Sequence, residues 1–174
     1  ITQDTWSKNY TFGIIGVATF GDFTPEAGFQ SNEVSEVRVN NWNASLTWRS
    51  GLWEAEGEFL YKHYTRHAAE PVKAYNFMAR RFFPIRSKWA NRVSVDLRFD
   101  GMTDNCDGKT DEAGNLIVTK TARKRLTLGS TLAYINLPIK AHLRLNYEQY
   151  FHGSSHASTP ADDNKLSLEL MLHF

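Results

Sequence analysis

Leu166-Ser-Leu-Glu-Leu-Met-Leu-His-Phe174 is the stretch that decides the fold class of this chain. Leucine stands at every second position from Leu166 to Leu172, and Phe174 continues the series. In an extended backbone, successive side chains point to opposite faces, so these residues share one apolar face and the residues between them form a polar face. The period of two predicts a β-strand over 166–174, and alone it predicts nothing more.

Alternation of apolar and polar residues recurs through the rest of the chain. Turn signals separate the alternating segments. The pattern predicts an all-β fold of about eight antiparallel strands, most of them about 9–12 residues long, the length that a tilted membrane strand needs. The predicted strands lie within 10–20, 42–49, 53–62, 75–80, 89–99, 125–134, 139–148 and 166–174.

The predicted connections alternate between short and long. The short turns are at Ser50, Pro84 and Pro138, and the long loops cover 21–39, 65–71, 100–120 and 151–164. Outer-membrane barrels carry short turns on the periplasmic rim and long loops on the other rim. The alternation therefore predicts an up-and-down transmembrane β-barrel whose last strand runs toward the rim of the short turns.

Aromatic residues near the predicted strand ends favour the same architecture, because aromatic girdles mark both interfaces of a membrane barrel. These residues are Trp42, Trp48, Trp53, Tyr61, Phe83, Trp89, Phe99, Tyr134, Tyr147 and Phe174. The alternative is a soluble sandwich or a lipocalin-like barrel. That fold would need a cover for many outward leucines and tryptophans.

The length, the net charge and the longest apolar run of the chain exclude further classes of protein. The chain has 174 residues and a formal net charge of +1, so we expect a single domain over 1–174 and no nucleic-acid partner. The longest apolar run, over 12–20, is shorter than the ~20 residues of a spanning helix. Because residue 1 is isoleucine, we expect a processed chain or a piece of a longer one.

Charged residues fill the predicted polar faces. Burying so many charges in a dry core would be very costly, whereas a water-filled lumen hydrates them. The predicted pore-lining residues are Arg49, Glu54, Glu56, Glu58, Arg80, Arg92, Asp96, Arg98, Arg125, Lys140, Arg144 and Glu148.

Two interpretations of this charged face remain open. From Arg80 to Arg144 the face is biased toward basic residues, which predicts a lumen that favours anions. Alternatively, cross-strand pairs such as Arg49–Glu54 or Arg144–Glu148 neutralise the field.

The sequence offers two further candidate sites, a calcium-like loop and a loop with two histidines. Asp104, Asn105, Asp107 and Asp111 resemble a calcium loop, but Thr103 stands where the pattern wants an acid, so an acidic surface loop is the favoured interpretation and no resident cofactor is expected. His152 and His156 share a loop with serines that lacks a nucleophile motif. No catalytic residue is expected.

Four segments carry a family resemblance. Lys140–Phe151, Leu166–Phe174, Trp89–Asp100 and Lys124–Tyr134 resemble the phosphate-selective O/P-type porins of Gram-negative outer membranes. The resemblance implies a passive channel of about 16–18 strands for small anionic, phosphate-like solutes. It also implies a monomer or homotrimer in contact with outer-membrane lipid and lipopolysaccharide, and an insertion machinery that recognises Phe174.

Two features depart from that family. About eight strands make only half of such a barrel, so we expect a missing upstream half. Glu54, Glu56 and Glu58 work against a phosphate site. The first hypothesis is therefore the C-terminal half of a porin for small hydrophilic solutes. The second is a self-contained eight-stranded barrel with a structural or adhesive role, and the third is a small lipid-modifying barrel enzyme that uses His152 or His156.

Overall fold

One antiparallel sheet makes up the protein in the computed structural model, which describes residues 11–34, 37–65, 70–104, 111–114, 122–136, 139–152 and 163–173. Within these ranges the chain is all-β, and no helix is long and apolar enough to span a bilayer. The strands are β1 (Phe12–Val17), β2 (Phe23–Val34), β3 (Val37–Ser50), β4 (Trp53–Tyr64), β5 (Val72–Pro84), β6 (Arg92–Met102), β7 (Arg123–Asn136), β8 (Ile139–His152) and β9 (Lys165–His173).

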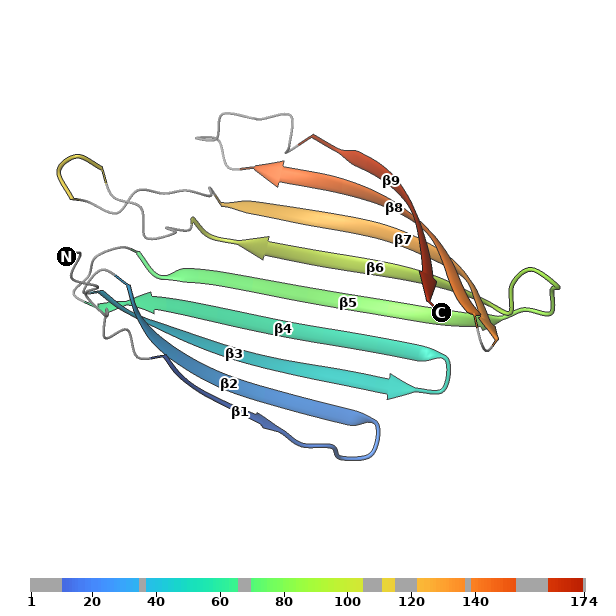
Figure 1. The fold of residues 1–174 in the computed structure, drawn as a ribbon, viewed down its shortest axis with the longest axis horizontal. Helices are drawn as coiled ribbons and strands as arrows, with labels where there is room; N and C mark the ends of the chain where they lie inside the picture. The colour runs from blue at the N-terminus through green and yellow to red at the C-terminus, as the bar shows by residue number, and fades with distance from the viewer. Residues whose placement is uncertain are drawn as a thin grey trace, which may run out of the picture.

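The nine strands follow one another in chain order, each antiparallel to the next. The sheet is open, and among the described residues β1 and β9 each have a neighbour on one side only. Figure 1 shows that the sheet is curled, with the chain end after β9 at the rim that carries the β3–β4, β5–β6 and β7–β8 turns. Because the strand number is odd, β1 and β9 run toward the same rim. The predicted direction of the last strand agrees with this arrangement.

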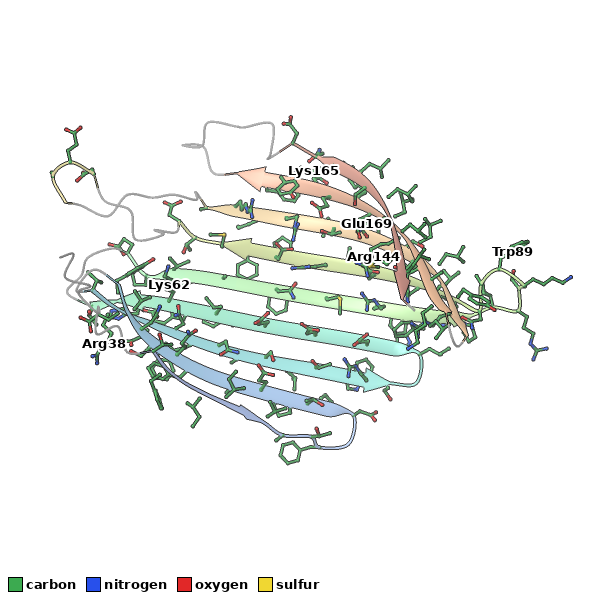
Figure 2. All side chains as sticks on the ribbon, in the orientation of Figure 1. Arg38, Lys62, Trp89, Arg144, Lys165 and Glu169 are labelled. Carbon is green, nitrogen blue, oxygen red and sulfur yellow. The ribbon has the colours of Figure 1, made fainter. Side chains whose placement is uncertain are left out.

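The register divides the sheet into an apolar and a polar face. One apolar row joins Leu46, Gly57, Phe77, Phe99 and Leu126 across β3 to β7. A polar row beside it joins Arg49, Glu54, Arg80 and Asp96 across β3 to β6. In Figure 2, carbon-only side chains project outward from the curled β8–β9 end, while Arg144 and Glu169 lie toward the inside of the curl. The apolar face is therefore convex and the polar face concave.

The apolar face has no cover among the described residues. The buried apolar residues of the described chain are few, and those in strands, Val39, Tyr64, Val72 and Ala133, have the register of the concave face. By contrast, Leu166, Leu168 and Leu170 are 73%, 68% and 66% exposed. A contiguous apolar surface of this extent marks a contact with a partner or a membrane. In the described ranges, no second layer of structure packs on the sheet as it does in a β-sandwich.

The predicted long loop over 21–39 is wrong, because β2 occupies most of it. Gly21, with φ of 57°, and Asp22 form a tight turn, and the backbone groups of Phe20 and Phe23 exchange hydrogen bonds of 2.8 and 3.0 Å. Pro25 lies near the start of β2, where its carbonyl accepts a hydrogen bond of 3.1 Å from the Ala18 N–H. A proline is tolerated there because the strand is only beginning.

This extra strand changes the predicted count and one direction. The sheet has nine described strands instead of about eight, and β1 runs parallel to β3, whereas the predicted long loop would have made them antiparallel. Among the other connections, 51–52 is a short turn as predicted, but 85–91 has seven residues, as many as 65–71, so the predicted short turn at Pro84 is wrong, and Pro84 ends β5. The antiparallel order places 51–52 and 85–91 at one rim, and the facing ends of β4 and β5, β6 and β7, and β8 and β9 at the other (Figure 1).

An aromatic ring covers a glycine on the convex face. Gly101 in β6 pairs with Tyr75 in β5. A Cβ atom added at Gly101 would lie 2.6 Å from the Tyr75 hydroxyl oxygen and 2.7 Å from its Cζ. Tyr75 also contacts Phe99, with 5.7 Å between ring centroids. The absent side chain at 101 therefore lets the Tyr75 ring lie flat across two strands.

We predict that Gly101→Ala destabilises the fold by about 1–3 kcal/mol, because the new methyl group overlaps the Tyr75 ring. The matched control is Gly16→Ala on the same face, where the nearest atom to the new Cβ is the Ala27 carbonyl oxygen at 3.9 Å. Equilibrium urea unfolding, followed by tryptophan emission, measures both. Equal effects of the two substitutions would refute the proposed packing.

Candidate functional site

The twelve predicted pore-lining residues lie on one face of the sheet. The register places them all on the concave polar face, from Arg49 in β3 to Glu148 in β8. They form cross-strand rows, since residues opposite each other in an antiparallel pair point to the same side. The site is therefore a wall of charges across six strands.

The first row is an alternating chain of cations and anions. Arg49 Nε donates to Glu54 Oε1 at 2.8 Å, which is one of the two pairs expected from the sequence. Arg80 Nη1 lies 3.6 Å from Glu54 Oε2, and Arg80 Nε lies 3.7 Å from Asp96 Oδ1. Asp96 reaches over Gly129 of β7, where a Cβ atom would overlap its carboxylate. Each carboxylate of the row thus faces at least one guanidinium.

A second cluster is centred on Arg125. Its Nη2 lies 3.1 Å from Asp100 Oδ1 in β6, and its Nη1 lies 3.2 Å from Glu148 Oε1 in β8. The hydroxyl of Tyr150 donates to Glu148 Oε2 at 2.6 Å. The Lys165 ammonium lies 5.1 Å from the centroid of the Tyr150 ring. This cluster ties β6, β7, β8 and β9 together.

The predicted pair Arg144–Glu148 is wrong. Both residues lie on β8 four positions apart, a separation of about 13 Å at roughly 3.3 Å per residue. Arg144 Nη1 instead lies 3.8 Å from Glu169 Oε2 on β9, and both side chains are labelled in Figure 2. Glu148 pairs with Arg125.

Some charges of the wall have no ion-pair partner within 4.0 Å among the described residues. Arg92 belongs to this group, and its guanidinium lies 4.7 Å from the centroid of the Phe82 ring. Glu56 and Glu58 on β4 and the exposed Lys140 on β8 complete it. Most of the cations on which the predicted anion preference depends thus form an ion pair with a carboxylate, whereas Arg92 and Lys140 do not.

Several polar atoms of the wall are buried without a hydrogen-bond partner. They are Arg80 Nε, Asp96 Oδ1 and Thr127 Oγ1. Thr127 lies on β7 between Arg98 and Glu148. Leaving such groups unsatisfied in a dry interior would cost about 1–3 kcal/mol each. The wall is therefore chemically suited to contact with water.

Sequence reasoning missed two members of the wall, Asp100 and Tyr150. The sequence predicts a loop at Asp100, yet β6 extends to Met102. Tyr150 lies beyond the predicted end of its strand, whereas the alternation places Asn76 on the face of Arg80 and Glu169 on the inward face. Asn76 accepts a hydrogen bond of 2.9 Å from Arg98 Nε. Extending the polar alternation by two residues, from Arg98 to Asp100 and from Glu148 to Tyr150, was the signal that could have found both.

The other predicted sites fall largely outside the described residues. Asn105, Asp107, His156 and Phe174 are in this group, and the side chain of His152 is too. Asp104 Oδ1 accepts a hydrogen bond of 2.6 Å from the Ala122 N–H. Within the described ranges, no group of three or more His, Cys, Asp or Glu residues could hold a metal ion. The calcium loop, the histidine enzyme and the terminal insertion signal stay predictions.

Comparison with known proteins found no similar protein. No family model matches the chain, no curated protein matches it, and no solved structure matches it.

We predict that Arg125→Ala destabilises the protein by about 1–3 kcal/mol, because it leaves two part-buried carboxylates, Asp100 and Glu148, without their shared cation. Arg49→Ala is the matched control. The Arg49 side chain is 71% exposed, so its loss should cost less than about 1 kcal/mol. Urea unfolding midpoints measure both. A loss at Arg49 equal to that at Arg125 would refute the ranking.

Proposed function

We propose that the chain forms part of the wall of an outer-membrane porin, a water-filled channel for passive diffusion of small hydrophilic solutes. Its convex apolar face meets lipid, and its concave charged face lines the lumen. No residue of the chain is assigned a catalytic role.

The opposite character of the two faces carries this proposal. Large apolar side chains are exposed on the convex face along strands of 6 to 14 residues. Ion-paired charges line the concave face, and some of its buried polar atoms need water. A soluble barrel would have the reverse arrangement, with apolar residues inside. Alternation of apolar outside and polar inside is typical of membrane barrels.

Closure favours a barrel larger than nine strands. The nine described strands leave β1 and β9 running in the same direction, so a direct pairing between them would be parallel. Bacterial single-chain barrels are antiparallel throughout and have an even strand number. Further strands between β9 and β1 would satisfy both conditions. This supports the porin of about 16–18 strands over the alternative of a self-contained barrel with a structural or adhesive role.

The ion pairs limit the selectivity that the channel would have. Arg80, Arg98 and Arg125 each lie within 4.0 Å of a carboxylate, so their fields are largely cancelled at the distance of a passing ion. Arg92 and Lys140 keep their positive charges, and Glu56 and Glu58 their negative charges, without such a partner among the described residues. The resemblance to phosphate-selective O/P-type porins supports an anionic solute, and we assign the anion preference to Arg92 and Lys140, which Glu56 and Glu58 oppose.

We predict that the full protein conducts ions in a planar bilayer, and that Arg92→Glu shifts its reversal potential toward cation preference under a salt gradient. Replacing a cation of the wall by an anion changes the field in the lumen by two charges. Single-channel recording in asymmetric KCl measures both the conductance and the shift.

Lys124→Glu is the matched control, since it makes the same change of charge. Lys124 pairs with Gly101 and Phe151 on the convex face, so its substitution should leave the reversal potential unchanged. An equal shift for both variants would contradict the assignment of the faces, and a protein that conducts no ions at all would contradict the channel.

A further inference from the structure

A single arginine lies among aromatic rings on the convex apolar face. Arg81 in β5 pairs with Trp53 in β4 and Val95 in β6. Its guanidinium carbon lies 4.9 Å from the centroid of the Trp53 ring and 5.1 Å from that of the Phe83 ring. No carboxylate lies within 4.0 Å of it in the described part of the chain. Arg81 thus holds an exposed charge among apolar and aromatic neighbours at this end of the convex face, whereas Lys124 lies near the other rim.

The position of Arg81 along the strand matches the headgroup level of a membrane. It lies three residues before Pro84, at the end of β5 that meets the rim of the β3–β4 and β5–β6 connections. Arginine on the lipid face of a barrel costs about 2–4 kcal/mol at the bilayer midplane and about 0–1 kcal/mol near the interface. Neighbouring tryptophan also prefers the interface. Arg81 is therefore placed where lipid phosphates would lie.

An apolar groove adjoins Arg81 on the same face. Its volume is about 720 Å³, and small residues, Ala55, Gly57 and Ala79, form its floor. Trp48 and Phe59 are among the large residues that line it. Ala55 pairs with Ala79 in the row next to that of Trp53 and Arg81. The groove therefore begins in the row of residues next to that of Arg81 on the same face.

The groove also has the length of one leaflet. From Ala55 to Phe59 it follows four residues of β4, about 13 Å at roughly 3.3 Å per residue. Half of a hydrocarbon core of about 30 Å is similar. A side chain in place of Gly57 would come within 3.3 Å of the Phe77 ring, so the glycine keeps the floor low.

We infer that Arg81 and this groove bind one anionic phospholipid, with its phosphate on the guanidinium and one acyl chain over Ala55, Gly57 and Ala79. Charge complementarity selects the occupant. A guanidinium forms paired hydrogen bonds to phosphate oxygens, and the apolar floor accepts only a hydrocarbon chain. The inference rests on the proposed function, because it needs the convex face to meet lipid.

The test is native mass spectrometry of the full protein extracted from vesicles of phosphatidylglycerol and phosphatidylcholine in equal amounts. We expect the wild type to retain one phosphatidylglycerol in at least about fivefold preference over phosphatidylcholine. Arg81→Gln should abolish this preference. Ala79→Trp, which fills the groove, should reduce retention of both lipids at least about fivefold.

Lys88→Gln is the matched control, because it removes an exposed cation from the 85–91 connection on the same rim. It should keep the wild-type preference. Equal loss in Lys88→Gln and Arg81→Gln would overturn the site, and so would an unchanged preference in Arg81→Gln. If the wild type inserts and conducts but shows no lipid preference, only this inference fails. If it does not insert, the proposed function fails first.

Discussion

An apolar face of nine strands has to be kept from water, and in the described part of this chain no second layer of protein does so. Leu166, Leu168 and Leu170 are each more than half exposed, and Phe77 and Leu97 on the central strands are half exposed or more. At about 25 cal/mol per Å² of apolar surface, leaving such a face in water would offset much of what the strand pairing contributes. Under the proposed function, contact with lipid would remove that cost.

The same constraint explains why the charged residues lie on the concave face. When hydrocarbon surrounds the convex face, polar groups can be hydrated only on the concave face. Charged residues then lie there in cross-strand rows such as Glu54, Arg80 and Asp96. Each ion pair links neighbouring strands while its remaining donors and acceptors meet water. Arg125 of β7 forms such ion pairs with Asp100 of β6 and with Glu148 of β8. The charged wall therefore both stabilises the sheet and sets the field that a solute would meet.

Most strands could be predicted from the alternation of apolar and polar residues. This pattern is visible in a short stretch of sequence because only one face of each strand is apolar. The sequence of charged positions likewise predicted one shared face, and the Arg49–Glu54 pair. It failed at β2, where Pro25 and Gly28 weaken the pattern, although Gly21-Asp22 between two phenylalanines is a hairpin signal. The partner of Arg144 was not predicted: Arg144 pairs with Glu169 because the register of β8 and β9 sets these two residues opposite each other.

Site-directed spin labelling along β9 tests the central claim most directly. Single cysteines at positions 165–172, in a Cys106→Ser background of the full protein in lipid vesicles, report the accessibility of each side chain to oxygen and to a polar nickel reagent. The account predicts high oxygen accessibility at Leu166, Leu168, Leu170 and Leu172, and high nickel accessibility at the positions between them. Low accessibility to both reagents at the leucines would contradict it, because those side chains would then be covered by protein rather than by lipid.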